Sequence, residues 1–340
     1  MIFDQLSEAK HELLVFGCDP VPAYRGIIAI HSTKPGPAVG GTRFWHYESE
    51  AAAIADALRL ARAMTYKSAL AGLPFGGGKA VIIGDARTTD RERLYRAHGR
   101  LIETLGGRFI TGEDVGTSTA DLEYVRLETK HVAVGPAMRI GDPSPWTARG
   151  VLRGMQAAAR HRWGTDELAG RTVMLQGCGN VGFQLAKELS QLGAKLLVAD
   201  PDVAKTQRAV VAFGATAIAP ADVFGAQADI FAPCALGEIL NAQTIPQLRV
   251  GIIAGAANNQ LSGEQDGETL RQRGILYAPD YVINAGGIIS GGVDLAGWDI
   301  AGGRQKVEDI YQTTLTVLAL AEAQGIAPQR AADQLAERRL

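Results

Sequence analysis

A glycine-rich turn after a short apolar stretch most constrains the fold of this 340-residue chain. Gln176-Gly-Cys-Gly-Asn-Val-Gly182 follows an apolar run at 172–176 and precedes a helical pattern at 181–192, and Asp200 ends the next apolar run. A glycine motif in this context of strand, turn, helix and strand is typical of a parallel, doubly wound sheet that binds a dinucleotide. The alternative is a glycine-rich turn that binds nothing, and it leaves this order of elements unexplained.

The three glycines have separate roles in such a motif. Gly177 allows the tight turn, Gly179 lets the backbone approach a pyrophosphate, and Gly182 allows the helix to pack closely on the strand. The phosphates would lie at the helix N-terminus, where unpaired N–H groups and the helix dipole favour anions.

Asp200 predicts which dinucleotide is bound. A carboxylate at the end of this strand accepts hydrogen bonds from the adenosine ribose hydroxyls and repels a 2′-phosphate, which favours NAD over NADP. Lys205 and Arg208 are close enough in sequence to leave some use of NADP open.

The remainder of the second half continues the same pattern. Apolar runs at 230–232, 251–254 and 275–278 alternate with helical segments and extend the predicted parallel sheet. A long amphipathic helix is predicted at 307–323, where apolar residues recur at helical spacing.

The first half is a mixture of strands and helices. Strands are predicted at 26–31 and 80–83, and an alanine-rich helix at 50–64 with Ser49 as its N-cap. The glycine- and proline-rich segment Gly135–Pro145 predicts a hinge between two domains.

Composition excludes several classes of partner. The chain is 46% hydrophobic and 21% charged, has a net charge of -2, and contains no basic block, so we expect no nucleic acid and no membrane as partner. The N-terminus lacks the pattern of a signal peptide, and the odd set of Cys18, Cys178 and Cys234 suits reduced thiols, so we expect a cytoplasmic location. No HxxxH or HExxH pair is present, so no metal site is predicted.

Two lysines and an aspartate are candidates for chemistry. Lys79 follows Gly76-Gly-Gly78, and these glycines let a ligand or another backbone come close to the ammonium. In such a partly desolvated place its pKa falls and the amine can act as a base. Lys67 and the glycine-bounded Asp114 complete the set. The alternatives are surface lysines whose stems cover apolar area and an aspartate in an ordinary turn.

A series of motifs, in order along nearly the whole chain, resembles the amino acid dehydrogenases of the glutamate, leucine, phenylalanine and valine group. The motifs that carry the resemblance are Gly36–Arg43, Met64–Lys67, Gly76–Lys79, Gly112–Gly116, Gly177–Gly182, Ala232–Ala235, Gly255–Asn259 and Asn284–Gly287.

The resemblance implies an α/β fold of two domains with a cleft between them. The N-terminal α/β catalytic domain would comprise residues 1–138 and 306–340 and would mediate homo-oligomer assembly. The Rossmann-type, doubly wound NAD-binding domain would comprise residues 139–305.

The resemblance also implies roles for individual residues. Lys79 would be the catalytic base that activates water, Asp114 would move protons to and from the amino group, and Lys67 would bind the substrate carboxylate. The other residues implied to bind substrate are Gly40, Gly41, Val39, Gly112, Asn259, Ile288 and Gly291. Those implied to bind NAD are Gly177, Cys178, Gly179, Asn180, Val181, Gly182, Asp200, Pro201, Thr147, Cys234, Ala235, Ala256 and Asn258.

The expected reaction is oxidative deamination of a hydrophobic L-amino acid to the 2-oxo acid and ammonia, and its reverse. Glutamate is disfavoured because Val39 stands where related glutamate enzymes have a lysine, and burying a carboxylate against valine costs several kcal/mol. Gly112 and Gly291 leave room for a large side chain, whereas Val39 and Ile288 reduce it. Leucine and phenylalanine are therefore the leading candidates, with tryptophan and valine left open. A dinucleotide-binding regulator without catalysis is the alternative of another class.

Overall fold

The computed structural model describes residues 2–21, 23–85, 87–133 and 139–340, and these form two compact units. The first unit contains residues up to Gly141 together with 294–297 and Leu340. The second contains Asp142–Val293 and Trp298–Arg339. The division falls at 141/142, within the segment Gly135–Pro145 that was predicted as a hinge, although residues 134–138 of that segment lie outside the described residues.

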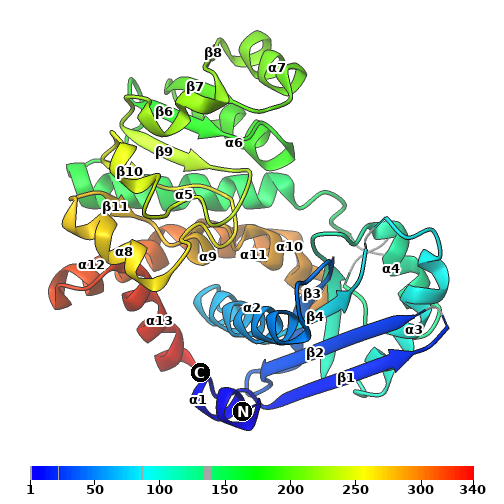
Figure 1. Cartoon of the computed structure of the whole chain (residues 1–340). Coiled ribbons are helices and arrows are strands. Elements are labelled where there is room, and N and C mark those ends of the chain that lie inside the picture. The colour runs from blue at the N-terminus through cyan, green and yellow to red at the C-terminus, as the bar shows by residue number, and fades with distance from the viewer. Residues whose placement is uncertain (1, 22, 86, 134–138) are drawn as a thin grey trace. The chain divides into compact units, whose positions relative to one another are not determined.

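The first unit has a mixed sheet of five strands in the order β1-β2-β4-β3-β5 (Figure 1). Strand β2 is antiparallel to both β1 and β4, whereas β3 is parallel to β4 and β5. The strands are β1 (Leu13–Asp19), β2 (Tyr24–Ser32), β3 (Ala38–Trp45), β4 (Gly76–Ile83) and β5 (Phe109–Glu113). The helices are α1 (Ile2–Glu8), α2 (Glu50–Leu70), α3 (Arg91–Glu103) and α4 (Thr119–Arg126).

Helices cover both faces of this sheet, because alternate strand residues point to opposite sides. Val81 and Ile83 of β4 pack against alanines of α2, whereas Ala80 and Ile82 pack on the side of α3 and α4. Helix α2 begins at the predicted N-cap, where the Ser49 hydroxyl accepts a hydrogen bond from the N–H of Ala52. The helix continues to Leu70, beyond the predicted end at 64, and so contains Lys67.

The second unit has a parallel sheet of six strands in the order β11-β10-β9-β6-β7-β8, as the predicted doubly wound fold requires (Figure 1). The strands are β6 (Thr172–Gln176), β7 (Lys195–Ala199), β8 (Thr216–Ala217), β9 (Ile230–Pro233), β10 (Ile252–Ile253) and β11 (Leu276–Tyr277). The α-helices are α5 (Ser144–Trp163), α6 (Asn180–Gln191), α7 (Val203–Phe213), α8 (Glu264–Gln272), α9 (Asp280–Ile283), α10 (Gly286–Leu295), α11 (Ile300–Glu308), α12 (Ile310–Gln324) and α13 (Pro328–Arg339). Two short 3-10 helices are η1 (Pro220–Gly225) and η2 (Ile245–Gln247).

Both faces of the inner strands of this sheet are buried. Met174, Phe231 and Tyr277 belong to a cluster that includes side chains from α8, η1 and η2. Their strand neighbours Val173 and Ile230 point to the other face and are also fully buried. Strands buried on both sides are typical of parallel sheets, and this explains their short apolar runs.

The C-terminal tail differs from the prediction in two ways. The single helix expected at 307–323 is interrupted at Asp309, where α11 ends and α12 begins. Residues 306–339 also pack with the second unit, in contrast to the predicted division, which placed 306–340 in the first domain. The physical reason is contact with α5: a Cβ on Gly150 would lie 2.8 Å from Ile310 Cδ1, and Arg149 Nε donates to Glu308 Oε1 at 2.6 Å.

Candidate active site

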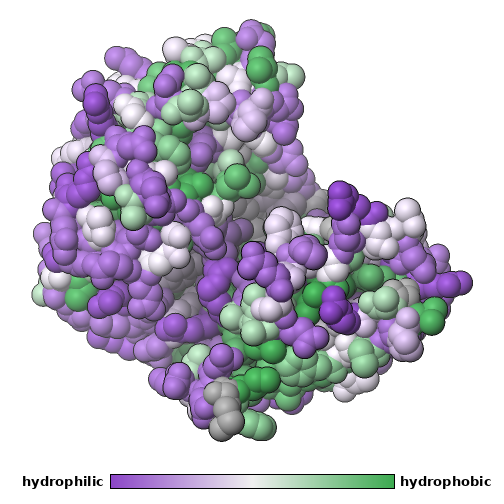
Figure 2. All heavy atoms as spheres, viewed as in Figure 1, coloured by the Kyte–Doolittle hydropathy of each residue, from purple (hydrophilic) through white to green (hydrophobic). Residues whose placement is uncertain are grey.

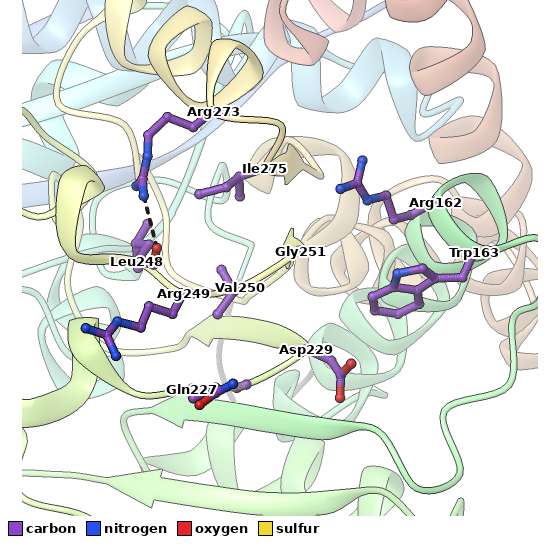
Figure 3. Close-up of a pocket in the computed structure, with 11 residues that line it drawn as sticks. Arg162, Trp163, Gln227, Asp229, Leu248, Arg249, Val250, Gly251, Arg273 and Ile275 are labelled. Carbon is purple, nitrogen blue, oxygen red and sulfur yellow. Dashed lines mark hydrogen bonds between the residues drawn. The ribbon is translucent and has the colours of Figure 1, made fainter.

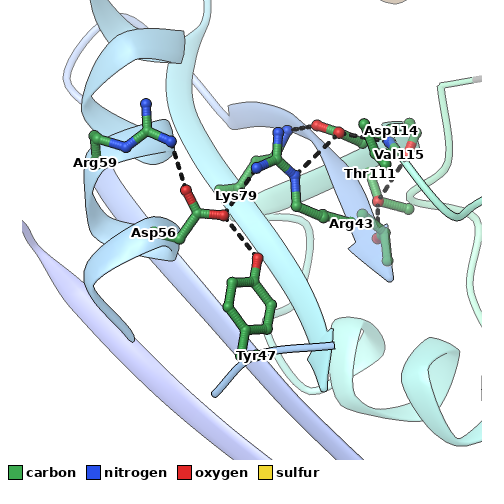
Figure 4. A network of polar contacts seen from close by, with 10 residues as sticks. Arg43, Tyr47, Asp56, Arg59, Lys79, Thr111, Asp114 and Val115 are labelled. Carbon is green, nitrogen blue, oxygen red and sulfur yellow. Dashed lines mark hydrogen bonds and ion pairs between the residues drawn. The ribbon is translucent and has the colours of Figure 1, made fainter. Parts of the chain in front are cut away.

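Lys79 is a buried cation in the middle of β4. All eight residues of this strand are buried, and Lys79 itself is 5% exposed. It shares the face of Val81 and Ile83, so its side chain lies on the side of the sheet that α2 covers. Its Nζ forms an ion pair with Asp114 Oδ2, which confirms that these two side chains, distant in sequence, come together (Figure 4).

The glycines before Lys79 allow close packing of the protein on itself. A Cβ on Gly76 would lie 1.8 Å from the Ser32 carbonyl oxygen, and one on Gly77 would lie 2.0 Å from the Thr65 backbone nitrogen. Of the two reasons considered for this glycine run, approach of another backbone is the one that the structure shows. The result is a tightly packed strand that holds the lysine in place.

Gly40 and Gly41 of β3 bring the third strand against the same pair. A Cβ on Gly40 would lie 1.8 Å from the Gly78 carbonyl oxygen. A Cβ on Gly41 would lie 2.3 Å from the Glu113 carbonyl oxygen and 3.0 Å from Asp114 Cβ. These contacts set the spacing between Lys79 on β4 and Asp114 immediately after β5.

Asp114 is a shared acceptor. Its Oδ1 accepts hydrogen bonds from the Val115 backbone N–H at 2.5 Å and from Arg43 Nε at 3.3 Å, while Oδ2 faces Lys79 (Figure 4). Because the carboxylate is distributed among three donors, its orientation toward the lysine is well defined.

The electrostatic environment brings the pKa of Lys79 close to neutral pH. Burial lowers the pKa of Lys79 to about 7, and the Arg43 guanidinium also lowers it, whereas Asp56 raises it. Lys67 and Arg59 act in the same direction as Arg43. An amine with such a pKa is half neutral near pH 7 and can accept a proton from water.

The other predicted substrate residues of the first unit lie in the same neighbourhood of the sheet. Lys67 is in the last turn of α2, half-buried, and close enough to act on the charge of Lys79. Val39 is buried and pairs with Gly77 of β4 and Ile110 of β5. Gly112 of β5 has no described atom within 4 Å of where a Cβ would be, so open space adjoins it.

The glycine motif of the second unit has the predicted geometry between β6 and α6. Gly177 has a φ of 97°, which suits glycine, and a Cβ there would lie 2.8 Å from Ala235 Cβ. A Cβ on Gly182 would lie 2.0 Å from the Gly177 carbonyl oxygen, so the helix packs closely on the turn. Gly179, by contrast, faces open space, so a ligand can come close to the protein backbone on this side.

Asp200 follows β7 and holds this turn. Its carboxylate accepts hydrogen bonds from the Cys178 backbone N–H at 2.8 Å and from the Asp202 backbone N–H at 2.9 Å. Asn180 and Val181 form the first turn of α6, and Pro201 follows Asp200 in the adjoining loop. Glycine turn, helix terminus and acidic residue are thus assembled as a dinucleotide site requires.

The remaining predicted cofactor residues follow the neighbouring strands. The Cys234 backbone N–H donates to the Gln176 carbonyl at 2.7 Å, which places Cys234 and Ala235 beside the glycine turn. Asn284 Nδ2 donates to Asn258 Oδ1 at 2.9 Å and to the Ala256 carbonyl at 3.1 Å, so the loop after β10 is fixed to the residues after α9.

Two further predicted residues have distinctive backbone surroundings. Asn259 has a φ of 52°, and its N–H donates to Asp280 Oδ2 at 2.6 Å. Thr147 of α5 lies against α10, because a Cβ on Gly287 would be 3.1 Å from its Oγ1. Ile288 and Gly291 follow on α10, and Gly291 has open space where its Cβ would be.

A pocket of about 410 Å³ lies elsewhere in the second unit, at the amino ends of β9, β10 and β11 (Figure 3). Its lining includes Arg162, Trp163, Arg249 and Arg273 and none of the predicted site residues. Ligands of open parallel sheets bind at the carboxyl ends of the strands, so this pocket is separate from the glycine turn.

The cysteines and acidic groups do not indicate other chemistry. Burial raises the pKa of the Cys178 thiol to about 11 and that of the Cys234 thiol to about 12, so neither is a ready nucleophile. Within the described ranges, no group of three His, Cys, Asp or Glu side chains is placed to hold a metal ion. In the same part of the chain, none of the helices combines the length and the hydropathy that a membrane span needs.

No role was predicted from the sequence for three residues near the Lys79–Asp114 pair: Arg43, which ends the motif Gly36–Arg43, Tyr47 and Asp56. Arg43 Nη1 donates to Asp56 Oδ2 at 2.9 Å, and the Tyr47 hydroxyl donates to the same oxygen at 2.7 Å (Figure 4). The alternation of β3 was the available signal for Arg43. Its neighbours Thr42 and Phe44 point to the face away from α2, so Arg43 points toward α2, as Lys79 does.

Comparison with known proteins agrees with both halves of this description. A family model described as "Glu/Leu/Phe/Val dehydrogenase, dimerisation domain" matches residues 18–131, and one described as "Glutamate/Leucine/Phenylalanine/Valine dehydrogenase" matches residues 198–298. The leucine dehydrogenase of Bacillus cereus is 50% identical over 100% of this chain and 93% of its own length. The valine dehydrogenase of Streptomyces coelicolor is 46% identical over 98% of this chain and 93% of its own length.

A solved structure gives the same result. The crystal structure of L-tryptophan dehydrogenase from Nostoc punctiforme superposes with a TM-score of 0.87 at 44% sequence identity and covers 100% of this chain and 98% of the other. With its buried lysine–aspartate pair and its dinucleotide turn, this chain therefore belongs to the Glu/Leu/Phe/Val dehydrogenase family and is an amino acid dehydrogenase that uses a nicotinamide dinucleotide.

Proposed function

We propose that the protein catalyses NAD-dependent oxidative deamination of a hydrophobic L-amino acid to the 2-oxo acid and ammonia, and the reverse reductive amination. The observation that carries this proposal is the ion pair between Lys79, 5% exposed, and Asp114. A buried amine with a pKa near 7 beside a carboxylate is suited to moving protons and is a costly way to stabilise a fold.

The pair serves the hydrolytic half of the reaction. Oxidised nicotinamide, when bound, supplies the acceptor for the hydride that leaves the substrate Cα. Neutral Lys79 then takes a proton from the water that attacks the resulting iminium carbon, and Asp114 stabilises the ammonium form of Lys79. Asp114 also exchanges protons with the departing amino group, and Lys67 pairs with the substrate α-carboxylate, which needs a cation when it is desolvated.

The residues around the glycine turn fit a dinucleotide. The open side of Gly179 and the first turn of α6 would receive the pyrophosphate, and Asp200 would accept hydrogen bonds from the adenosine ribose. NAD is favoured over NADP because a 2′-phosphate would face the Asp200 carboxylate. Lys205 is engaged with Asp202 in an ion pair of 3.7 Å, which gives it less freedom to pair with such a phosphate.

A hydrophobic substrate is supported by Val39 and by the named relatives. Val39 is buried and offers no partner for a second carboxylate, which disfavours acidic amino acids. The relatives include leucine, tryptophan and valine dehydrogenases, and leucine and phenylalanine are the substrates that we propose first. The open space at Gly112 and at Gly291 is the specific observation that favours a large, even aromatic, side chain as the second candidate.

The test is a substrate screen with the purified full-length chain. NADH absorbance is followed at alkaline pH with NAD and single L-amino acids, with NADP and L-glutamate as comparisons. We expect turnover with leucine, phenylalanine or their relatives and at least tenfold lower activity with NADP and with glutamate. Absence of turnover with every hydrophobic amino acid, together with retained NADH binding, would favour a non-catalytic dinucleotide-binding regulator instead.

The first unit has features suited to assembly into a homo-oligomer. β1 is an edge strand of its sheet, and Phe3, Phe16 and Val21 are 81%, 54% and 68% exposed. Figure 2 shows hydrophobic residues gathered over the part of this unit that contains β1 in Figure 1. Such an edge is a ready surface for a second copy, and the family model for this region is described as a dimerisation domain.

The three free cysteines support a cytoplasmic location.

A further inference from the structure

Lys79 and Asp114 have charged neighbours of both signs. Arg43 of β3 contacts Asp114 with its Nε and Asp56 of α2 with its Nη1, so one guanidinium bridges two carboxylates. We propose that Arg43 and Asp56 are opposed positioning residues: Arg43 holds Asp114 and favours the neutral form of Lys79, whereas Asp56 draws Arg43 away and favours the charged form. This inference rests on the proposed function, in which neutral Lys79 is the base.

Arg43 contacts both carboxylates at the same time. The two contacts are 3.3 Å to Asp114 and 2.9 Å to Asp56, and the arginine side chain is 19% exposed. The planar guanidinium can point to both carboxylates at once because its donors diverge, which the single ammonium of lysine cannot reproduce. The shorter contact is with Asp56. The Asp56 carboxylate therefore limits how closely the Arg43 guanidinium can pair with Asp114.

Asp56 is fixed in its charged form by three neighbours. It accepts hydrogen bonds from Arg43, from the Tyr47 hydroxyl at 2.7 Å and from Arg59 at 2.6 Å. Burial opposes the ionisation of Asp56, but these donors outweigh it and lower the pKa of Asp56. Burial and the Asp56 carboxylate raise the pKa of the Tyr47 phenol, so Tyr47 remains a neutral donor.

The charged groups that act on Lys79 come from three elements around it. Arg43 comes from β3, whereas Asp56, Arg59 and Lys67 come from α2, and Asp114 follows β5. Arg43, Lys67 and Arg59 each oppose protonation of Lys79, and Asp56 supports it. Arg43 is the largest of these four influences after burial, and Asp56 is the next.

The direct and indirect effects of each residue have the same sign. Removing the Arg43 charge takes a cation away from Lys79 and also releases Asp114 to pair with Lys79 alone, and both changes favour the ammonium form. Neutralising Asp56 takes an anion away and leaves Arg43 free to pair more closely with Asp114, and both changes favour the neutral amine. The two variants should therefore move the titration of Lys79 in opposite directions.

The experiment measures kcat/KM against pH for the full-length enzyme with NAD and L-leucine, or the best substrate of the screen. The variants are Arg43→Gln, Asp56→Asn and the double variant, with Arg91→Gln as a matched control. Arg91 forms a 2.6 Å ion pair with Asp121 in the same unit and is not among the main influences on Lys79. Titration of the substrate amine is common to all the proteins, so differences between the profiles belong to the enzyme.

Arg43→Gln should move the acid limb of the profile upward by about one pH unit, and Asp56→Asn should move it downward by about half a unit. At pH values below the acid limb, kcat/KM of Arg43→Gln should be about tenfold lower than that of the wild type. At alkaline pH the two values should become similar. The double variant should return toward the wild-type limb, because the two charges are removed together. Arg91→Gln should lower the melting temperature and leave the limb unchanged.

Shifts of the same sign in both single variants, or a limb that does not move in either, would overturn the inference. If Arg43→Gln fails to fold, the direction of Asp56→Asn decides: a limb that stays in place or moves upward counts against it. Failure of the proposed function is distinguishable, because it would be seen as absence of turnover in the wild type before any variant is compared.

Discussion

Substitution of alanine for two glycines of the glycine turn tests the structure most directly, because the two variants should behave differently. A Cβ on Gly182 would lie 2.0 Å from the Gly177 carbonyl oxygen, whereas a Cβ on Gly179 meets no described atom within 4 Å. An ordinary contact needs about 3.5 Å, so Gly182→Ala requires α6 to move by about 1.5 Å. Overpacking of this kind costs about 1–3 kcal/mol.

The expected result separates stability from binding. Gly182→Ala should lower the melting temperature by about 2–4 °C for each kcal/mol lost and should weaken NADH binding, because the displaced helix carries the N–H groups that we propose bind the phosphates. Gly179→Ala should leave the melting temperature unchanged, since its φ of -67° suits alanine and its Cβ would have space. It should still weaken NADH binding at least tenfold, about 1.4 kcal/mol, because the methyl group would occupy the space proposed for the pyrophosphate.

Both quantities are measured on the same samples, by thermal unfolding followed by circular dichroism and by titration of NADH fluorescence. Gly225→Ala is the matched control, since this glycine also faces open space but lies outside the turn. The reasoning is refuted if Gly179→Ala binds NADH as the wild type does, or if it is destabilised as much as Gly182→Ala.

Three further predictions concern the first unit. Lys79→Ala should abolish turnover and leave NADH affinity within about twofold, measured by initial rates and fluorescence titration, because the glycine turn is in the second unit; a collapse of NADH affinity would count against this placement. Gly112→Val should reduce kcat/KM for phenylalanine about tenfold more than for valine, without a change in melting temperature, because it fills open space; an equal loss for both substrates would show that the space is not used. In the wild type, kcat/KM should rise about tenfold per pH unit up to a limb near pH 7. The reason is that the neutral fraction of Lys79 grows with pH until its pKa is passed. A kcat/KM that falls with pH across this range would exclude the neutral amine as base.

The second unit was the more predictable half of the fold. Its first strand occupies 172–176 as predicted, and the turn, α6 and β7 follow in the predicted order. The information here is local: an apolar run, a glycine motif and an acidic residue occur within thirty residues. The tail was less predictable, because whether α12 packs on α5 or on another surface depends on distant partners such as Ile310 and Gly150.

The candidate site was predictable only in part for a similar reason. Lys79 is conspicuous because three glycines precede it, and Asp114 because glycines surround it. Arg43 ends the motif Gly36–Arg43 without a predicted role, Asp56 has no marker, and the sequence also contains twenty-four other arginines. Their contact depends on the alternation of β3 and on the rotation of α2 about its axis, which no short pattern specifies.

The position of Asp200 affects how easily cofactor preference can change. Its carboxylate accepts two backbone N–H groups, one of them from Cys178 inside the glycine turn, in addition to any ribose it receives. A substitution chosen to admit a phosphorylated ribose would leave those amides without their acceptor and loosen the turn in the same step. Under the proposed preference for NAD, evolution toward NADP, in nature or in a directed library, would therefore require a second change that supplies a new anchor for the loop.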